Sequence, residues 1–496
     1  MSEPPLYRRL ADEIHALIDK GSIRAGHRLP SLRVTARQRQ ISIGTALEAY
    51  VLLENRGAIE ARPKSGYYVR NPKPAKARSM AGSTPGPAVP VAEKDLTQHV
   101  IDLGLDPGYF PLGSAFPERD LLPLKKLAKV SAAVGRSDAG ILGRYPMGVP
   151  YPPFVQELSR KYLRTGAAIP HDEFIITSCC SEALDLALAA VTNRGDVVAV
   201  ESPAYFGFLR LLATRGLKAI EVPVDSNRGL SLEALTVALD TNDVKALVVT
   251  PNFHNPTGSC MPNSRKEQLY AILCDYDIPA LEDDIYADLH FGSIRPKTLK
   301  AWDREGRVLL CSSLSKTLAP GLALGWIAAG RYTAKVDELK WSNSPLFTQK
   351  IATQFLQEGY DRELRRLRAN FKEQTAAVRA AVLTYFPPGT RVSEPAGGFV
   401  LWLELPPQVD SLQLRADALR EKISTAPGPI FSARGEFRNY LRINCGLKWT
   451  GSFEKAVKTL GRLASSQGSA PRVSKGTIGS VDRSRPVVDA GVGPLF

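Results

Sequence analysis

One lysine, Lys316, lies where this chain could carry covalent chemistry. It stands in residues 311–326, CSSLSKTLAPGLALGW, after an apolar run at residues 308–310 that predicts a short buried strand. Functional residues often lie in the loop after a strand, and a lysine amine there can form a Schiff base with an aldehyde cofactor. A single lysine is much more often an ordinary surface residue, so the rest of the chain must decide between these interpretations.

Alternating apolar strands and amphipathic helices between residues 111 and 465 predict an α/β domain built around a mainly parallel sheet. The expected strands are residues 174–176, 197–200, 218–222, 246–250, 280–281, 307–310 and 324–328. In open sheets of this type, ligands bind beyond the carboxyl ends of the strands. Polar residues after these strand ends are therefore candidates for the same site as Lys316.

Several such segments precede the lysine. The helix expected at residues 182–191 follows the segment SCCS, and the free amides at its start suit a phosphate, although a plain helix cap explains the segment equally well. Tyr205 offers an aromatic ring that could stack on the ring of a ligand, but most tyrosines are only structural. The NPTG turn at residues 255–258 needs no function as a turn. Residues 282–284 are three adjacent acids, any of which could face a ligand.

The segments NPTG, DxxY, SLSK and LRIN follow one another in the order found in fold-type I pyridoxal-phosphate (PLP) aminotransferases, and the stretch SLSKTLAPGL resembles the cofactor-lysine segment of that family. The resemblance implies an aminotransferase-like domain with a smaller α+β subdomain and PLP as the cofactor. It implies that Lys316 is the catalytic residue and holds the cofactor as an internal aldimine. It also implies that Asp283 keeps the pyridine nitrogen protonated. Asp283 is chosen among the three acids because Tyr286 follows three residues later, as in the family.

The other site residues follow from the same resemblance. Asn255 would bond to the phenolic oxygen of the cofactor, and the guanidinium of Arg442 would bind a substrate carboxylate with two hydrogen bonds. The expected cofactor-binding residues are Lys316, Asn255, Asp283, Tyr286, Tyr205, Ser313, Cys180 and Ser181, and the expected substrate-binding residues are Arg442, Gly113 and Ser114.

Two positions depart from the family pattern. Ala323 stands seven residues after the lysine, where the family usually has an arginine that binds the cofactor phosphate. Cys179 stands in place of the glycine of the phosphate loop. Neither departure threatens the fold, but together they predict a lower affinity for PLP.

The first 70 residues predict a separate module. Apolar residues recur at helical spacing over residues 6–18, Ser31 and Ser42 are candidate N-caps of two further helices, and residues 59–69 predict a β-hairpin with basic residues near its tip. Three short helices and a basic hairpin are typical of a winged helix-turn-helix. A small helical protein-interaction domain is the alternative.

Residues 6–70 resemble the N-terminal domain of GntR-family transcription regulators through RLPSLR and ISIGTALEAYVLLENRGAIEARPKSGYYV. The resemblance implies that the third helix enters the major groove of DNA while the hairpin contacts the backbone or the minor groove. Many members have an arginine in place of Ile43; an isoleucine cannot donate to guanine, though it could touch a thymine methyl group. The expected DNA-binding residues are Arg33, Ser42, Ile43, Gly44, Thr45, Arg62 and Lys64.

Composition sets further bounds. Residues 1–80 hold 15 Lys/Arg and 7 Asp/Glu, a net charge of +8 out of +14 for the whole chain, which favours a nucleic-acid partner for this end. The six cysteines show no metal-binding spacing, so no metal site is expected. No apolar run reaches the ~18 residues of a membrane helix and the N-terminus has no apolar signal core, so a cytoplasmic protein without a membrane partner is expected.

Residues 71–90 and residues 466–496 lack an apolar period. Residues 71–110 begin with the first of these stretches, which is rich in Pro, Ala and Gly, and are interpreted as a flexible linker, whereas residues 466–496 are interpreted as a disordered tail. The expected domains are therefore residues 1–70 and residues 111–465.

A GntR-type head joined to an aminotransferase-like domain resembles the MocR subfamily of bacterial regulators, over about residues 6–465. The resemblance implies a homodimeric transcription regulator that binds DNA and senses PLP, or an amino compound that forms an aldimine with it. One alternative is a working PLP-dependent aminotransferase whose basic head only localises it. Another is a domain that lacks PLP and serves only for dimerisation.

Overall fold

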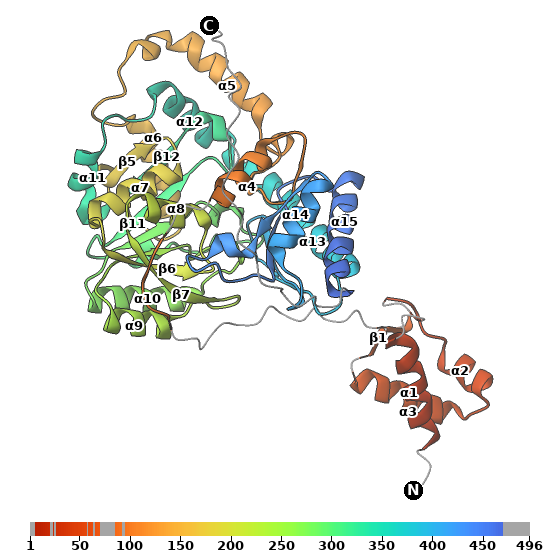
Figure 1. The fold of residues 1–496 in the computed structure, drawn as a ribbon. Helices are drawn as coiled ribbons and strands as arrows, with labels where there is room; N and C mark the ends of the chain where they lie inside the picture. The colour runs from red at the N-terminus through yellow and green to blue at the C-terminus, as the bar shows by residue number, and fades with distance from the viewer. Residues whose placement is uncertain are drawn as a thin grey trace, which may run out of the picture. The chain divides into compact units, whose positions relative to one another are not determined.

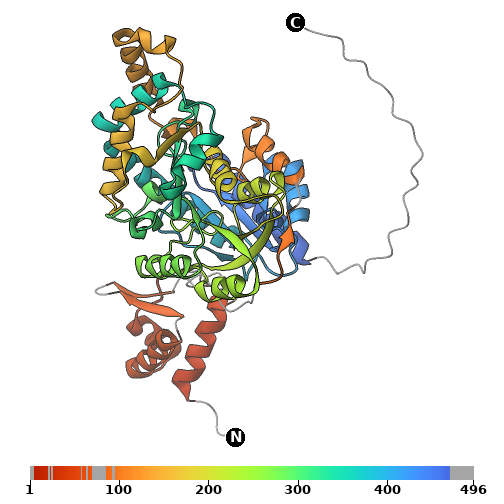
Figure 2. The ribbon, with the colours of Figure 1, turned by 90° about the vertical axis from the view of Figure 1, so that its left-hand side faces the viewer.

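The chain divides into two compact units, residues 1–76 and residues 77–496. The computed structural model, drawn in Figures 1 and 2, describes residues 5–19, 23, 26–56, 58–62, 65–69, 85–91 and 95–469. Each unit has a hydrophobic core of its own.

The N-terminal unit consists of three helices followed by a hairpin, as the sequence predicted (Figure 1). The elements are α1 (Leu6–Asp19), α2 (Leu32–Arg39), α3 (Ile43–Asn55), β1 (Ile59–Arg62) and β2 (Gly66–Val69), with the two strands antiparallel. Ser31 and Ser42 are the N-caps of α2 and α3, since their hydroxyls accept hydrogen bonds from backbone amides of the first turn. The cap hydroxyl of Ser42 lies 3.0 Å from the Thr45 amide.

Tyr50 fixes α3 against α2. Its side chain is fully buried in the small core, and its hydroxyl donates to the carbonyl oxygen of Pro30 at 3.0 Å and lies 2.9 Å from Oγ1 of Thr35. The ring also packs edge-on against Tyr67 of the hairpin, with 5.1 Å between centroids. Tyr50 of α3 therefore contacts both α2 and the hairpin, and these contacts hold α3 in a defined orientation.

The large unit is organised around a nine-stranded sheet with the order β3-β7-β6-β9-β10-β11-β12-β5, to which β8 is added beside β7. The pairings from β7 to β11 are parallel, whereas β3, β12 and β5 pair antiparallel with their neighbours. The seven strands expected from the sequence are all present, so the mainly parallel sheet is confirmed. Their bounds are β3 Val89–Pro90, β5 Phe174–Thr177, β6 Val197–Ser202, β7 Lys218–Asp225, β8 Gly229–Leu230, β9 Val244–Val249, β10 Ala280–Asp283, β11 Val308–Ser313 and β12 Gly325–Ala328.

Helices cover both faces of this sheet because its strands are apolar on both sides. Val198 of β6 and Leu281 of β10 pack with residues of α7 and α8, while Ala199 and Ala280, one position away, pack with residues of α9 and α10. The helices of this layer and its surroundings are α5 Leu124–Ser137, α6 Pro152–Leu163, α7 Cys180–Val191, α8 Phe206–Thr214, α9 Leu232–Thr241, α10 Asn263–Asp275, α11 Thr333–Leu339 and α12 Leu346–Glu358.

A smaller α+β part follows along the chain, as expected. Its four-stranded sheet has the order β13-β14-β17-β16 and is antiparallel throughout. The elements are α13 Tyr360–Tyr385, β13 Arg391–Val392, β14 Val400–Glu404, α14 Ser411–Arg420, β15 Ile423–Ser424, β16 Ala426–Pro427, β17 Tyr440–Asn444 and α15 Gly451–Ser469.

The predicted linker of residues 71–110 is wrong in its second half. Residues 95–105 form α4 (Asp95–Leu105), β3 joins the central sheet, and β4 (Phe110–Pro111) pairs with β15. Helix α4 is held because Val100 is buried in a cluster with Phe206 and Trp402, and the Pro-rich composition from which the linker was inferred ends before this helix. Residues 71–84 lie outside the described residues.

The tail prediction needs a smaller correction. Helix α15 continues to Ser469, so residues 466–469 are helical, and the remainder of the predicted tail lies outside the described residues. This helix packs on α13 and α14 through Phe453, Val457 and Leu460, all fully buried.

Candidate cofactor site

Lys316 lies in the loop after β11, next to the carboxyl end of β10, as expected. Its Nζ donates to the carbonyl oxygen of Ala115 at 2.8 Å and lies 4.7 Å from the ring centroid of Phe116. Ala115 is about two hundred residues away in the sequence. Its neighbours Gly113 and Ser114 were expected in the site, but Ala115 itself was not.

The surroundings of Lys316 favour a reactive amine. Burial, and next the charge of Arg442, lower the pKa of Lys316 to about 8, while the carboxylate of Asp283 opposes the shift. A neutral amine is the form that attacks an aldehyde, so a lowered pKa is what Schiff-base chemistry near neutral pH requires.

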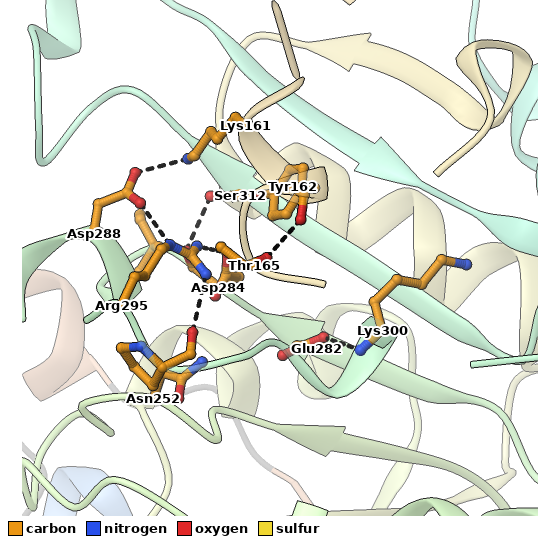
Figure 3. Close-up of polar contacts among 12 residues, drawn as sticks. Lys161, Tyr162, Thr165, Asn252, Glu282, Asp284, Asp288, Arg295, Lys300 and Ser312 are labelled. Atoms are coloured by element: carbon orange, nitrogen blue, oxygen red, sulfur yellow. Dashed lines mark hydrogen bonds and ion pairs between the residues drawn. The ribbon is translucent and has the colours of Figure 1, made fainter. Parts of the chain in front are cut away.

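The three adjacent acids are separated by the strand geometry of β10. Glu282 accepts hydrogen bonds from the backbone amides of Leu299 and Lys300, at 2.6 and 2.9 Å. Asp284 is paired with Arg295 at 2.5 Å (Figure 3). Of the three acids, Asp283 is the one whose charge raises the pKa of Lys316. The structure therefore supports the choice of Asp283 that was based on the resemblance.

Asp283 is a buried carboxyl with few partners. It accepts from the amide of Ile285 at 3.1 Å and from the thiol of Cys180 at 3.5 Å. Burial raises the pKa of Asp283 to about 6, although these hydrogen bonds act in the opposite direction. A cationic partner such as a protonated pyridine nitrogen would stabilise its ionised form.

Arg442 joins the predicted substrate residues to the predicted cofactor residues. Its Nη1 donates to Oδ1 of Asn255 at 2.9 Å, and its Nη2 donates to the carbonyl oxygen of Gly113 at 2.6 Å. Nδ2 of Asn255 lies 3.4 Å from the Tyr286 hydroxyl. Ser114 contacts the same strand as Arg442, β17, since Nδ2 of Asn444 donates to the Oγ of Ser114 at 2.8 Å.

The guanidinium of Arg442 is only partly satisfied. It is 1% exposed, and its Nε has no acceptor among the residues that the structure describes. Burial lowers the pKa of Arg442 to about 10. An under-compensated buried cation of this kind suits a carboxylate ligand, in agreement with the role that the resemblance implies.

Tyr205 lies close enough to Arg442 and Asp283 to interact with them electrostatically. It precedes α8 and packs against Phe206 and Phe208 with centroid distances of 4.7 and 5.3 Å. Burial raises the pKa of Tyr205 to about 12, so the ring stays neutral. The charge of Arg442 lowers, and the charge of Asp283 raises, the pKa of Tyr205. Its position is consistent with a stacking role, which remains a prediction.

The expected phosphate end is built from α7 and the loop after β11. Oγ of Ser313 donates to Oγ of Ser315 at 3.1 Å, and the amides of Cys180 and Ser181 start α7. The thiol of Cys180, however, is directed at Asp283, so only its backbone can serve a phosphate. Cys179 is the N-cap of α7, with its Sγ accepting from the Glu182 amide at 3.4 Å.

The structure places a second carboxylate besides that of Asp283: Glu182 lies in the first turn of α7, and it was not identified from the sequence as part of the site. Glu182 accepts from both the amide and the hydroxyl of Ser178, and its Oε1 lies 3.5 Å from Nζ of Lys340. Although burial raises it, these hydrogen bonds and the charge of Lys340 hold the pKa of Glu182 below its usual value. Lys340 is thus a buried cation near the start of α7, and no motif indicated it.

The residues present fit PLP. They supply a partly buried lysine of lowered pKa, a carboxyl opposite it, an aromatic ring, hydroxyls and free helix amides, and a half-satisfied arginine. When bound, PLP supplies an aldehyde that condenses with primary amines and a ring that withdraws electrons from them. The chain would orient the cofactor through Asp283 and Asn255 and the amino compound through Arg442.

The predicted DNA-binding residues lie on one module. Arg33 is exposed on α2, and Ser42 to Thr45 form the start of α3, where Ile43 is 53% exposed. Arg62 ends β1, but its side chain is not among the parts that the structure describes, and Lys64 lies outside the described residues.

Membrane-spanning helices and metal-binding clusters are both absent from the residues that the structure describes. Among those residues, no helix is long and apolar enough to span a membrane, and no group of three or more His, Cys, Asp or Glu side chains is placed to hold a metal ion.

Comparison with known proteins gives two family matches. Residues 111–458 match the family "Aminotransferase class I and II", and residues 6–69 match "Bacterial regulatory proteins, gntR family". The first match covers more than half of the chain, and the boundary between the two falls where the two structural units separate.

Relatives with the same arrangement are similar along nearly their whole length. The uncharacterized HTH-type transcriptional regulators YjiR and YdcR of Escherichia coli K12 are each 37% identical to this chain, over 92% of it and 98% of their own length. Among solved structures, LysN, an alpha-aminoadipate aminotransferase of Thermus thermophilus complexed with N-(5'-phosphopyridoxyl)-L-leucine, superposes with a TM-score of 0.69. It is 25% identical, and the match covers 76% of this chain and 95% of LysN. The chain therefore belongs to the GntR-type transcription regulators that carry a PLP-binding aminotransferase class I and II domain, the arrangement of the MocR subfamily.

Proposed function

We propose that this regulator binds its operator through the N-terminal unit and that PLP at Lys316, or an amino compound that reacts with it, changes that binding. The observation that carries the proposal is the pairing of a lysine of lowered pKa with Asp283 in a chain that begins with a gntR-type head. Lys316 would hold the aldehyde carbon, Asp283 the pyridine nitrogen and Arg442 the carboxylate of an amino acid. Such a protein acts in the cytoplasm and needs no membrane partner.

An exposed apolar surface of the large unit supports a homodimer. Tyr145, Met147 and Val149 are 84%, 64% and 81% exposed, and Trp341 is 93% exposed. Asn343 joins the two segments, since its amide donates to the carbonyl oxygen of Pro146 at 2.7 Å and its side chain to that of Gly148 at 2.5 Å. Aromatic and Met side chains of this kind, gathered in one place, are typical of a protein interface, and we propose a second copy of the chain as the partner.

The rival function is sustained transamination. The site contains the groups that an aminotransferase would use, so a single half-reaction with an amino acid is compatible with both functions. What separates them is continued turnover with an amino donor and a keto-acid acceptor, set against a change in DNA binding that needs no turnover.

The decisive experiment measures both outputs on the full-length protein. Retention of a DNA fragment from the protein's own promoter region is measured without PLP, with PLP, and with PLP plus a panel of amino acids, and keto-acid formation is followed in parallel. A regulator is expected to show ligand-dependent DNA affinity with little turnover. Steady turnover with DNA affinity that never responds to PLP or amines would favour the enzyme.

A prediction arises at Ala323, which lies between the two segments that would hold the phosphate. The amide of Leu314 donates to the carbonyl oxygen of Leu324 at 3.0 Å, and Gly325 lies against the backbone of Cys179. A charge-assisted hydrogen bond contributes roughly 1.5–3 kcal/mol, so Ala323→Arg is expected to tighten PLP binding by about ten- to a hundredfold. The measurement is a titration of PLP into apo protein, followed by its visible absorption.

Ala168→Arg is the matched control, because it adds the same charge at an exposed position of the large unit away from the cofactor residues. Equal and tight affinities in wild type and Ala323→Arg would mean that another cation already serves the phosphate. Lys340, held 3.5 Å from Glu182, would be that cation, and Lys340→Met would then weaken PLP binding.

A further inference from the structure

The large unit contains a charged cavity that the proposed function does not use. It has a volume of about 180 Å³ and is bounded by the carboxyl end of α6, by α12 and by the first turns of α13. Its charged lining residues are the basic Arg160, Lys161, Arg164, Arg295 and Arg368 and the acidic Glu157, Asp288 and Asp361. Basic side chains therefore outnumber acidic ones in its wall.

The deep end of the cavity is a neutralised network of ion pairs (Figure 3). Asp288 lies between Nζ of Lys161 and Nε of Arg295, each 2.7 Å from its carboxylate, and Arg295 continues to the fully buried side chain of Asp284. Burial alone would raise the pKa of Asp288, but the charges of Lys161 and Arg295 hold it far below its usual range. The two cations and two carboxylates of this floor balance, so it carries no spare positive charge.

The open side of the cavity carries two exposed pairs. Arg160 bonds to Glu157 at 2.9 Å, and Arg164 bonds to Asp361 at 3.3 Å. The side chains of both arginines are more than half exposed, so these pairs contribute little to stability and can open at small cost.

Arg368 is different, because its positive charge has no carboxylate partner. Its Nε donates to the backbone carbonyl oxygen of Asp288 at 2.6 Å, which fixes the direction of the guanidinium. Within the described part of the chain, its two Nη groups have no hydrogen-bond acceptor. Burial lowers the pKa of Arg368 more than the nearby acids raise it, so its charge is under-compensated.

We propose that this cavity binds a small oxyanion with two negative charges, either phosphate or a short dicarboxylate. The free edge of Arg368 would hold it with two parallel hydrogen bonds, and Arg160 and Arg164 would turn inward from the rim. A planar guanidinium favours carboxylate and phosphate because its donors match two oxygens at once. The volume has room for such an anion and not for a nucleotide or a peptide.

The site is connected to the cofactor lysine through one hydroxyl. The hydroxyl of Tyr360 lies 3.2 Å from Oδ2 of Asp288 and 2.8 Å from Oγ1 of Thr317. Thr317 directly follows Lys316 in the sequence. A bound anion adds negative charge at the far end of this chain of hydrogen bonds. Negative charge favours a protonated group at Lys316, so the anion is expected to raise the pH at which that group loses its proton.

Binding is tested by calorimetry on full-length, PLP-loaded protein at constant ionic strength, with inorganic phosphate as one probe and succinate as the other. Loading with PLP keeps the cofactor's own phosphate site filled. Saturable binding of one probe is expected, weakened at least tenfold in Arg368→Gln and unchanged in Arg362→Gln, an exposed arginine of the same helix that does not line the cavity. If neither probe binds saturably to the wild type, or if Arg368→Gln binds as the wild type does, the proposal is overturned.

Thermal unfolding of each variant controls for loss of fold. Should Arg368→Gln not fold, the double variant Arg160→Gln/Arg164→Gln carries the test, because both side chains are exposed and it is expected to weaken binding severalfold. A double variant that binds as tightly as the wild type would then overturn the proposal.

The connection to Lys316 rests on the proposed PLP site and has its own readout. Phosphate or succinate is expected to raise the pH midpoint of the visible band in the wild type. In Tyr360→Phe the anion should bind within about twofold of wild type but no longer move that midpoint, since the hydroxyl that joins Asp288 to Thr317 is gone. Binding without any shift in the wild type would refute the connection and leave the anion site standing, whereas absence of the band itself would speak against the cofactor site.

Discussion

Lys316→Ala is expected to abolish the visible absorption that PLP gives on binding to this protein. Lys316 is the lysine that the structure places beside Asp283 in the cofactor site, and a covalent linkage to its amine cannot be replaced by an alanine methyl group. PLP can still be held by Asp283, Asn255 and the hydroxyls, so the expected result is free aldehyde absorption rather than loss of all binding. The measurement is a spectrum of purified protein supplied with PLP.

Lys297→Ala is the matched control, since Lys297 is an exposed lysine of the same unit whose Nζ packs over Trp302 at 5.5 Å. It should keep the wild-type band. A Lys316→Ala protein that retained a lysine-borne band would show that another amine holds the cofactor.

The pH dependence of PLP capture follows from the same geometry. A lysine at its ordinary pKa near 10.4 would be almost fully protonated at pH 7 to 8. Because burial and Arg442 lower the pKa of Lys316 to about 8, the neutral amine becomes the major form above that pH. Capture of PLP by apo protein should therefore accelerate as pH rises through about 8 and then level off.

The sequence predicted the central sheet well because the information was local. Each expected strand is a short apolar run, and the segments NPTG, DxxY and SLSK stand at or after strand ends, so a parallel sheet brings them to one edge. The choice of Asp283 over its neighbours came from the resemblance to the aminotransferase family, and the pairing of Asp284 with Arg295 in the structure is consistent with it.

Other features could not be predicted because they depend on distant partners. Helix α4 follows the Pro-rich segment and was included in the predicted linker, and it is fixed by the packing of Val100 against Phe206 and Trp402, which come from distant parts of the sequence. Two contacts likewise join segments that are far apart in the sequence and that no motif connects. They are the hydrogen bond from Lys316 to the Ala115 carbonyl oxygen and the ion pair between Lys340 and Glu182. Cys180 was expected at the phosphate, but the rotation of α7 turns its thiol to Asp283 and leaves only its amide for that role.

Arg33→Ala is expected to weaken operator binding by about ten- to a hundredfold, since a charge-assisted bond to phosphate contributes roughly 1.5–3 kcal/mol. Arg33 is exposed on α2, and no acceptor for it is found in the described part of the module. Its loss should also reduce the slope of log affinity against log salt by about one, because one fewer counterion is released. Arg39→Ala, on the same helix but already bonded to Glu13 at 2.9 Å, is the matched control and should change binding much less.

Ile43 is expected to influence which bases the protein prefers in its operator and to leave the salt dependence of DNA binding unchanged. Ile43, Leu47 and Val51 are 53%, 42% and 43% exposed and recur every four residues along α3, so one side of this helix presents methyl groups and no donors. In a major groove, such a side can contact the methyl group of thymine but cannot bond to guanine.

Replacing a contacted thymine by uracil removes only that methyl group. At ~0.8 kcal/mol for a buried CH₂, the wild-type protein should lose about fourfold in affinity at such a position, with an unchanged salt slope. Ile43→Ala should bind the thymine and uracil operators equally, because the apolar contact is already gone. Arg33→Ala should still distinguish them, since it removes a phosphate contact that carries no base information. If uracil substitution has no effect at any operator position while the salt dependence persists, α3 does not use these methyl groups to recognise its operator.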